Sequence, residues 1–576
     1  MPPHEHDQRE AKPTPSRSSL QSVGMDQVAN GAIHLTLGLA VSTIVLKLVA
    51  RFNGASLLDD AFMYQRYAYN ILKGHGIAWN PGGEPTYGLT SPLFLAIAVP
   101  VRAVAGLRRP VLAQMLSSLI SGAVLVVLLV LLTTRANRGP AWIQRVVLLL
   151  ALFSLAISQA ANHFVFGMDT PFGMAYFAGY LLLAAAVENS PSRVGAIVLG
   201  AVGGLSLLVR PELGLAAVLT PACLAFSGDD AAQRRAGRIA FSAAVSTLAL
   251  SLVTTRLYFH SFLPLPFYAK VLHPYGPAIQ LTYRGINTTE LLLFIGDYWP
   301  LLGLIGLDFA LGFKRWWRLT AAVEKAAAAT VVLLIGYEWM SVLQIMPQEH
   351  RFYQPVVPAL VFLAGRAGAR LQTTLDRDLA APAACVALLT WFWLVPALVA
   401  SGQEATKAVI EERVAEFRLD TLATEKQREA FKIAEFCALP DDAVIATSEI
   451  GLISVLAPKK HFIDLAGLND TDIALHGFSA ARLFARAEPD ILYFPHPNYR
   501  EMIKALLEAP QMANYDIFPP SSLGSTLGVG IKRTSRHYER MQQIMANLVP
   551  VAPDKYDPSL GVAPPGAPSD RADHPQ

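Results

Sequence analysis

Apolar residues form long runs along the chain, and short polar segments separate them. Eleven runs approach the length of a membrane-crossing helix, which needs roughly 20 apolar residues. They are residues 31–50, 111–133, 142–160, 171–187, 194–209, 212–227, 239–259, 291–312, 326–346, 354–367 and 382–401. A further run, Pro92 to Val101, stops at Arg102 and suits a helix at the membrane interface. The pattern predicts an α-helical polytopic membrane protein with 11–12 transmembrane helices, and charge favours eleven.

Lysine and arginine are unequally distributed between the predicted loops. With eleven spans, one set of loops carries fourteen, whereas the opposite loops after the first carry four, Arg210, Lys270, Arg284 and Arg351. Loops rich in these residues stay in the cytoplasm. We therefore expect a multi-pass protein of the plasma (inner) membrane with a cytoplasmic amino terminus. The first loop, 51–110, and the carboxyl-terminal region would then be extracytoplasmic.

The flanking segments differ from the apolar region 31–401. Residues 1–30 are polar and rich in Pro and Ser, which predicts a disordered cytoplasmic segment. Residues 402–549 combine charged, helix-like stretches with the short apolar runs AVIAT, HFIDL, DILYF and GVGIK, which is typical of a small periplasmic α/β domain. Residues 550–576 are rich in Pro, Gly and Asp and are expected to be disordered. The chain shows no internal repeat of the kind found in two-halved transporters.

Composition agrees with a membrane protein. The chain has 576 residues, of which 53% are hydrophobic and 16% charged, against roughly 25% charged in soluble domains. Mean hydropathy is +0.37. A net charge of +3 is too small to indicate a nucleic-acid partner. The three cysteines are far apart and lack CxxC spacing, so we expect neither a disulfide framework nor a zinc site.

The first loop contains more chemistry than a connector needs. Asp59 and Asp60 open a helical pattern that Gly74 closes. One aspartate could cap the helix, but two neighbouring carboxylates repel each other and only one is needed for capping. The other could act as a general base or a metal ligand. Arg66 follows Asp59 by two helical turns and could pair with it.

The loop after this helix is rich in glycine and in hydrogen-bonding side chains. His75, Asn80 and Thr90 offer donors and acceptors suited to sugar hydroxyls, and Trp79 or Tyr87 could stack on a sugar ring. The alternative for each residue is an ordinary role in an ordered loop.

Other charged residues fall in loops on the predicted outer side. Asp169 precedes Thr-Pro and a new helix, so it is either a helix cap or a site residue. Arg210-Pro211-Glu212 forms an outer turn, which could be a simple ion pair. Lys270 and the pair His350-Arg351 could join Arg210 in a cationic pocket for a lipid-linked phosphate. Contact with lipid headgroups is the competing explanation for these cations.

Together these motifs resemble the GT-C superfamily of polytopic glycosyltransferases, most closely the mycobacterial terminal arabinofuranosyltransferase group. The matching segments, in order from about residue 50 to 495, are DDAFMYQRYAYNILKGHGIAWNPGGEPTYGLTSPL, GMDTP, LVRPE, LPFYAKVL, HRFYQPVVPAL and SEIGLISVLAPKKHFIDLAGLND. The chain departs from the group's pattern at Asp169, where glutamate is commoner, at Leu265-Pro266, which replaces Asn-Thr, and at Leu89, which replaces an aromatic residue. These departures bear on the sugar and the acceptor more than on the reaction.

The resemblance implies an inverting sugar transfer from a polyprenyl-phosphate donor held at a membrane lipid surface to a glycan, lipid or protein acceptor of the cell envelope. Asp59 would be the general base. Asp60 and Asp169 would orient the acceptor or, with Asp59, hold a divalent cation such as Mg²⁺ or Mn²⁺. The remaining implied site residues bind the donor phosphate (Lys270, Arg351, His350 and Arg210) or the substrates (Arg66, His75, Asn80, Tyr87, Thr90, Glu212 and Tyr268).

Two other functions remain open on the sequence. A transporter or flippase of a lipid-linked substrate would carry charges inside its spans and broken helices in paired positions, whereas the charges here gather in the outer loops. A catalytically inactive scaffold of the same fold is the second alternative, and the intact Asp59-Asp60 pair argues against it.

Overall fold

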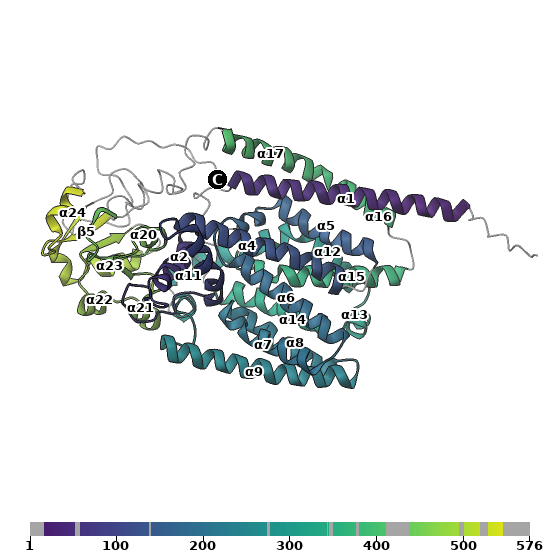
Figure 1. Cartoon of the computed structure of the whole chain (residues 1–576), viewed down its shortest axis with the longest axis horizontal. Coiled ribbons are helices and arrows are strands. Elements are labelled where there is room, and N and C mark those ends of the chain that lie inside the picture. The colour runs from purple at the N-terminus through teal and green to yellow at the C-terminus, as the bar shows by residue number, and fades with distance from the viewer. Residues whose placement is uncertain are drawn as a thin grey trace, which may run out of the picture.

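A bundle of apolar helices forms most of the molecule, and a small α/β domain lies at one end of it (Figure 1). The computed structural model describes residues 17–51, 58–136, 140–272, 277–342, 344, 349–375, 380–410, 437–494, 500–518 and 528–544. The expected tail, 550–576, and the charged segment 411–436 lie outside these residues.

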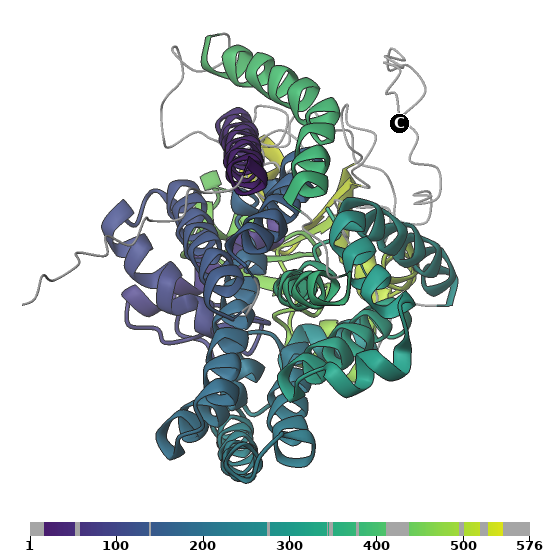
Figure 2. The ribbon, with the colours of Figure 1, turned by 90° about the vertical axis from the view of Figure 1, so that its right-hand side faces the viewer.

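Most α-helices of the bundle follow the predicted apolar runs. The helices are α1 (Arg17–Arg51), α2 (Phe62–Leu72), α3 (Leu95–Ala105), α4 (Pro110–Leu131), α5 (Ala141–Ile157), α6 (Thr170–Asn189), α7 (Arg193–Leu205), α8 (Gly214–Ser227), α9 (Ala231–Phe259), α10 (Leu265–Phe267), α11 (Pro277–Asp297), α12 (Trp299–Ala310), α13 (Phe313–Leu319), α14 (Ala322–Met340), α15 (Val357–Leu375), α16 (Ala380–Leu389) and α17 (Trp391–Ile410). Of these, α2, α10 and α13 lie outside the predicted runs. Helix α1 lies beside α17, and α9 packs along α7 and α8 on the opposite side, as both views show (Figures 1 and 2).

Fewer helices than expected are long and apolar enough to cross a membrane alone. Within the described residues these are Ala29–Arg51, Pro110–Ala136, Thr170–Asn189, Ala231–Phe259 and Pro382–Ala408. A sixth candidate is the pair Gly285–Asp297 and Trp299–Ala310, bent by 79°. All eleven predicted runs fall on helices, but the others are short or carry charged residues. The expectation of eleven spans therefore overcounts the helices that meet this test.

Two predicted segments, the amino-terminal one and the interfacial run from Pro92, can be compared with the structure. Helix α1 begins at Arg17, so residues 17–30 belong to a helix and not to a disordered segment. The interfacial run forms a single 3₁₀ turn, Pro92–Phe94, followed by α3, which has 11 residues. At about 1.5 Å per residue, α3 is roughly half as long as a span must be.

The carboxyl-terminal domain contains a mixed five-stranded sheet of order β2-β1-β3-β5-β4. Its strands are β1 (Val444–Thr447), β2 (His461–Asp464), β3 (Ile491–Phe494), β4 (Tyr515–Phe518) and β5 (Gly528–Lys532), and its helices are α20 (Gly451–Leu456), α21 (Thr471–His476), α22 (Ala480–Arg486), α23 (Arg500–Leu507) and α24 (Tyr538–Ile544). Strand β1 pairs in parallel with β2 and β3, whereas β5 is antiparallel to β3 and β4. The four apolar runs correspond to β1, β2, β3 and β5, and β4 was not predicted.

This domain shares a hydrophobic core with the first loop of the bundle. Tyr67 and Trp79 of that loop belong to the same buried cluster as Ile445, Ile453 and Phe462 of the domain. Helix α2 also packs directly on α20. The domain is therefore built onto the first loop, and the functional residues of that loop lie at the junction.

Candidate functional site

A cavity of about 910 Å³, part of it open to solvent, lies at the junction between the bundle and the carboxyl-terminal domain. Its polar lining is Asp60, Tyr64, Thr90, Asp169, Thr170, Arg210, Glu212, Lys270, Tyr337, Glu338 and Arg351. Apolar side chains complete the walls, among them Met63, Phe267, Val271, Phe352 and Leu468. Concave sites with apolar walls and a few convergent polar groups are typical of small-molecule sites.

Seven predicted site residues meet in this cavity, although they come from separate segments of the chain. They are Asp60, Thr90, Asp169, Arg210, Glu212, Lys270 and Arg351. The loops that the charge pattern assigned to one side of the membrane therefore converge at one end of the bundle.

Asp60 forms the central ion pair of the cavity. Its Oδ2 accepts a hydrogen bond from Nη2 of Arg351 at 3.2 Å. Burial by itself would raise the pKa of Asp60, but the positive charges of Arg351 and Lys270 outweigh burial and lower it. Burial in turn lowers the pKa of Lys270, although Asp60 opposes this change. Asp60 is thus a firmly ionised carboxylate held by two cations.

Asp169 stands at the first turn of α6 but does not cap it, because its side chain makes no capping hydrogen bond. Instead, Oδ1 lies 3.9 Å from Nη1 of Arg210. The residue is 2% exposed. Its buried Oδ2 has no hydrogen-bond partner among the described residues, but the hydroxyl of Tyr64 hydrogen-bonds to the same carboxyl and lowers its pKa. Burial raises the pKa of Asp169 above its ordinary value even though Arg210 lowers it. The geometry therefore favours the site role over the capping role.

Glu338 is a cavity residue that sequence reasoning missed. It belongs to α14 and is 2% exposed. Its Oε2 has no hydrogen-bond partner within the described part of the chain. The signal was available, because an acidic residue inside a predicted span, here 326–346, is itself a reason to suspect a site. The nearby ion pair between Arg210 and Glu212 was anticipated, and it lines the same cavity.

Asp59 is oriented differently from its neighbour. Its two carboxylate oxygens accept hydrogen bonds from the backbone N–H groups of Gly451 and Leu452, each at 2.8 Å. Among the described residues that line the cavity, Asp59 is absent. Burial raises the pKa of this carboxyl to about 6. This placement differs from the expected role as general base, because both oxygens that could take a proton face the carboxyl-terminal domain.

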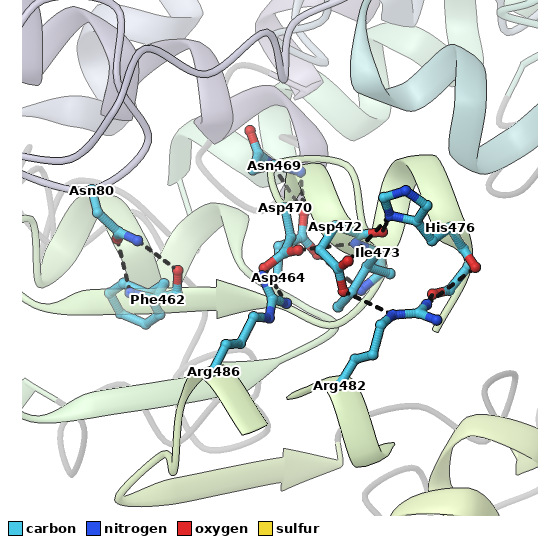
Figure 3. Close-up of polar contacts among 12 residues, drawn as sticks. Asn80, Phe462, Asp464, Asn469, Asp470, Asp472, Ile473, His476, Arg482 and Arg486 are labelled. Carbon is cyan, nitrogen blue, oxygen red and sulfur yellow. Dashed lines mark hydrogen bonds and ion pairs between the residues drawn. The ribbon is translucent and has the colours of Figure 1, made fainter. Parts of the chain in front are cut away.

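Arg66 and Asn80 also hold the two parts of the protein together and do not reach the cavity. Arg66 donates to the carbonyl oxygens of Trp79 (2.7 Å), Ser454 (2.6 Å) and Lys460 (2.9 Å). Asn80 bonds both the N–H and the C=O of Phe462 on β2, each at 2.9 Å (Figure 3). The expected pair of Arg66 with Asp59 and the expected substrate contacts are thus replaced by contacts between domains.

Four further candidates lie outside the described cavity lining. His75 is exposed to solvent. Tyr87 is buried and stacks on Phe259 of α9, with ring centroids 4.7 Å apart. Tyr268 packs against the ring of Phe267.

His350 is the fourth, and it binds α11 instead of a phosphate. Its Nδ1 lies 2.6 Å from Oε2 of Glu290, and its Nε2 lies 3.4 Å from Oδ2 of Asp297. Two carboxylates already occupy both ring nitrogens, so this imidazole is not available to the cavity.

A divalent cation held by Asp59, Asp60 and Asp169 does not fit this arrangement. Within the described residues, no group of three or more His, Cys, Asp or Glu side chains is placed to hold a metal ion. Asp59 is turned toward backbone N–H donors, and Asp60 is paired with Arg351. Among the described side chains of the cavity, Arg and Lys balance the negative charge of the carboxylates.

Comparison with solved structures identifies the architecture. The structure of ArnT from Cupriavidus metallidurans bound to undecaprenyl phosphate matches with a TM-score of 0.51 at 12% identity, over 87% of this chain and 98% of that chain. The apo oligosaccharyltransferase of Archaeoglobus fulgidus matches with a TM-score of 0.48 at 11% identity, over 86% and 76% of the two chains. AglB from the same organism, in complex with an inhibitory peptide and a dolichol-phosphate, gives 0.49 at 10% identity, over 87% and 74%.

Comparison at the sequence level reaches only the end of the chain. A protein-family profile described as a domain of unknown function (DUF8728) matches residues 416–555, which include the sheet domain. A search of curated proteins found no match. The chain is thus a mostly helical protein with several membrane-length apolar helices and a small carboxyl-terminal sheet domain, and its fold is similar to that of the ArnT structure.

Proposed function

We propose that this protein is a glycosyltransferase that moves a sugar from a polyprenyl-phosphate carrier to a glycan, lipid or protein acceptor of the cell envelope. The observation that carries the proposal is the cavity in which three cations and four carboxylates face one another at the end of an apolar bundle. Apart from Arg210 and Glu212, which share one turn, these side chains come from separate segments of the chain. The ArnT structure of similar fold holds undecaprenyl phosphate, which supports a lipid-linked donor. The motif likeness to the terminal arabinofuranosyltransferase group supports an envelope acceptor.

The cations provide a site for the donor phosphate. The positive charges of Lys270 and Arg351 both lower the pKa of Asp60, and Arg210 lies 3.9 Å from Asp169. A phosphate bound to Lys270 and Arg351 would make charge-assisted hydrogen bonds, and its departure would be eased because the leaving charge is already met. The apolar walls at Phe267 and Val271 suit the first carbons of a polyprenyl chain.

Asp169 is the best-placed general base. Its Oδ2 is buried without a partner, and its raised pKa makes it a stronger base than an ordinary aspartate. Oδ2 would take the proton of an acceptor hydroxyl as the hydroxyl oxygen attacks the anomeric carbon. The bond from that carbon to the phosphate oxygen breaks, and the polyprenyl phosphate leaves with the electron pair. Attack opposite the leaving group inverts the configuration. Asp60 would orient Arg351 toward the phosphate.

The site would face the extracytoplasmic side, with the amino terminus in the cytoplasm. The unequal distribution of Lys and Arg between the predicted loops supports this orientation. A donor whose long tail stays in the bilayer also requires a site at the membrane edge, which agrees with a cavity at the end of the helices.

Asp169→Asn in proteoliposomes supplied with a panel of polyprenyl-phosphate sugars tests the proposal. We expect transfer to fall by about 10²–10⁴-fold, the usual contribution of a general base, with polyprenyl-phosphate binding retained. Glu84→Gln, which changes an exposed side chain of the first loop, is the matched control. Normal turnover by Asp169→Asn would remove Asp169 from the base role. Failure of the wild-type protein to consume any donor of the panel would reject the function itself.

A further inference from the structure

We infer that the carboxyl-terminal domain holds the catalytic loop in place and that Asp59 is the positioning residue through which it acts on Asp60. This gives a role to the domain of this chain that the family profile of unknown function matches. It rests on the proposed function only because Asp60 is named as a site residue. Its evidence is a set of contacts between residues almost 400 positions apart in the chain.

The first contact joins Asp59 to the start of α20. Both carboxylate oxygens accept backbone N–H groups, from Gly451 and Leu452, at 2.8 Å each. The carboxylate does not cap its own helix, because the N-cap positions of the 3₁₀ turn Asp59–Ala61 and of α2 are Leu58 and Ala61. Two bonds to rigid backbone donors fix the position and rotation of this side chain. Since Asp60 is the next residue, the direction in which it enters the cavity is fixed as well.

Glycine at position 451 allows this contact. A Cβ atom added there would lie 1.8 Å from the carbonyl oxygen of Asp59 and 2.8 Å from its Cγ. Real Cβ contacts are never so short, so any side chain at position 451 must push the backbone of Asp59 away. The loop and the domain therefore touch at backbone distance.

A second glycine, in the first loop, makes the same kind of close contact with the domain. A Cβ atom added to Gly88, which lines the cavity, would lie 2.0 Å from Oδ1 of Asn469 in the domain. Asn469 Oδ1 also accepts a hydrogen bond from the hydroxyl of Tyr67 at 2.8 Å. The domain thus contacts the first loop at backbone distance at two positions, Asp59 and Gly88.

The loop that carries Asn469 is itself rigid. Asp464, at the end of β2, accepts the N–H of Ala466 at 2.9 Å and that of Asn469 at 2.7 Å. Figure 3 shows this carboxylate under Asn469, with Asp470 and Arg486 paired beside it. Leu468, the residue before Asn469, lines the cavity directly. The domain therefore contributes both a wall of the cavity and the support of its central carboxylate.

Two variants and one control test the inference. Gly451→Ala forces the loop away from the domain side, and Asp59→Ala removes the same contact from the loop side. Lys504→Ala changes a side chain of the same domain that is 68% exposed and whose partner is Glu508. Three quantities are measured on the full-length protein: kcat and KM with a polyprenyl-phosphate sugar, hydrogen exchange of residues 58–64 and 450–453, and the unfolding temperature.

We expect Gly451→Ala and Asp59→Ala each to lower kcat by about tenfold or more, because displacement of a site residue by 1 Å can cost 10²-fold, while KM for the donor changes little. Exchange in residues 58–64 should rise in both, and the amides of Gly451 and Leu452 should exchange faster in Asp59→Ala. The double variant should be no worse than the more severe single one, because both remove one contact. Lys504→Ala should match the wild type in every measurement.

Unchanged exchange of residues 58–64 in both single variants would overturn the inference, as would kcat values within about twofold of wild type while the loop exchanges freely. The exchange measurement does not depend on any donor. The inference can therefore fail while the wild type transfers sugar, and it can hold even if the proposed donor class is wrong. If Gly451→Ala does not fold, Asp59→Ala, which adds no atoms, gives the answer alone.

Discussion

Adjacent residues of like chemistry have different tasks in this protein. Asp59 and Asp60 carry the same side chain, yet Asp59 bonds two backbone N–H groups of another domain and Asp60 pairs with Arg351 inside the cavity. Burial raises the pKa of Asp59 to about 6, while nearby cations lower that of Asp60 despite burial. Environment, not residue type, separates a positioning carboxylate from one that faces the cavity.

Arg66→Lys tests how strongly a single buried guanidinium holds the two domains together. Arg66 is fully buried, and burial lowers its pKa to about 9. It bonds three carbonyl oxygens and also lies over the rings of Trp79 and Phe462, at 4.8 and 5.0 Å from their centroids. A lysine cannot reach acceptors in three directions or stack in a plane, so we expect a loss of about 1–3 kcal/mol.

Thermal unfolding in detergent measures this loss as a fall of roughly 1–3 °C in Tm. Lys73→Arg, at an exposed position near the end of α2, is the control and should leave Tm unchanged. An Arg66→Lys protein as stable as the wild type would show that the domains are held by their shared apolar core alone.

At the scale of the element, His350 ties the segment before α15 to α11. Burial by itself would lower the pKa of His350, but hydrogen bonds to Asp297 and Glu290 outweigh it and raise the pKa to about 9. Because the folded pKa lies above the unfolded value of about 6.5, the protonated form stabilises the fold. That stabilisation is complete below about pH 6.5 and is lost as the pH rises through about 9.

We therefore expect the Tm of the wild type to fall between pH 7 and pH 10, and His350→Gln to be less stable at pH 7 with a weaker pH dependence over that range. Thermal unfolding as a function of pH measures both effects. His75→Gln, which changes an exposed histidine, should follow the wild-type curve. Parallel curves for the wild type and His350→Gln would show that the imidazole does not carry this pH dependence.

At the scale of the whole molecule, ionised residues occupy both ends of the bundle. Arg370 of α15 pairs with Asp308 of α12 at 2.7 Å and with Glu324 of α14 at 2.5 Å. Glu188, at the end of α6, lies 3.6 Å from Arg366. Asp169 stands at the beginning of α6, about 28 Å away for 19 helical residues. The expectation that charges gather in the outer loops is therefore incomplete, since this network is buried at the opposite end.

This network bears on the transporter alternative. Its charges pair with one another across helices and do not line the described cavity. Within the described residues one bent helix pair is found, Gly285–Asp297 with Trp299–Ala310, whereas inverted repeats would give two in corresponding positions. Ion pairs of this kind join helices inside a bundle. They therefore do not favour a transporter over an enzyme whose site is the cavity.

Arg370→Met tests the structural role of the network. The substitution leaves Asp308 and Glu324 buried without their cation, which costs about 3–5 kcal/mol. We expect a lower Tm and lower membrane abundance, with kcat per folded molecule close to that of wild type because the cavity lies at the far end. Arg145→Met removes a cation from α5 that donates to Asn30 and serves as the control. A selective loss of kcat in a stable Arg370→Met protein would instead connect this network to the site.

Hydropathy and local propensity were sufficient for much of this architecture. Apolar runs located the helices and four of the five strands, because burial in a membrane or a sheet core demands apolar sequence at those positions. The helix opened by Asp59-Asp60 ends with Gly74 in the left-handed conformation at φ +81°, as its position indicated. Strand β4, Tyr-Asp-Ile-Phe, was not predicted, although it is as long as β1, β2 and β3.

The assignment of site residues depended on contacts between distant parts of the chain. The loop sequences contain the charges, and seven of the fourteen candidates reach the cavity. Nothing local distinguishes Asp59 from Asp60, identifies Asn80 as a partner of β2, or brings Glu338 of α14 beside Lys270. A side chain's direction and its surrounding charges depend on which segments pack around it, and those segments can lie 402 residues away.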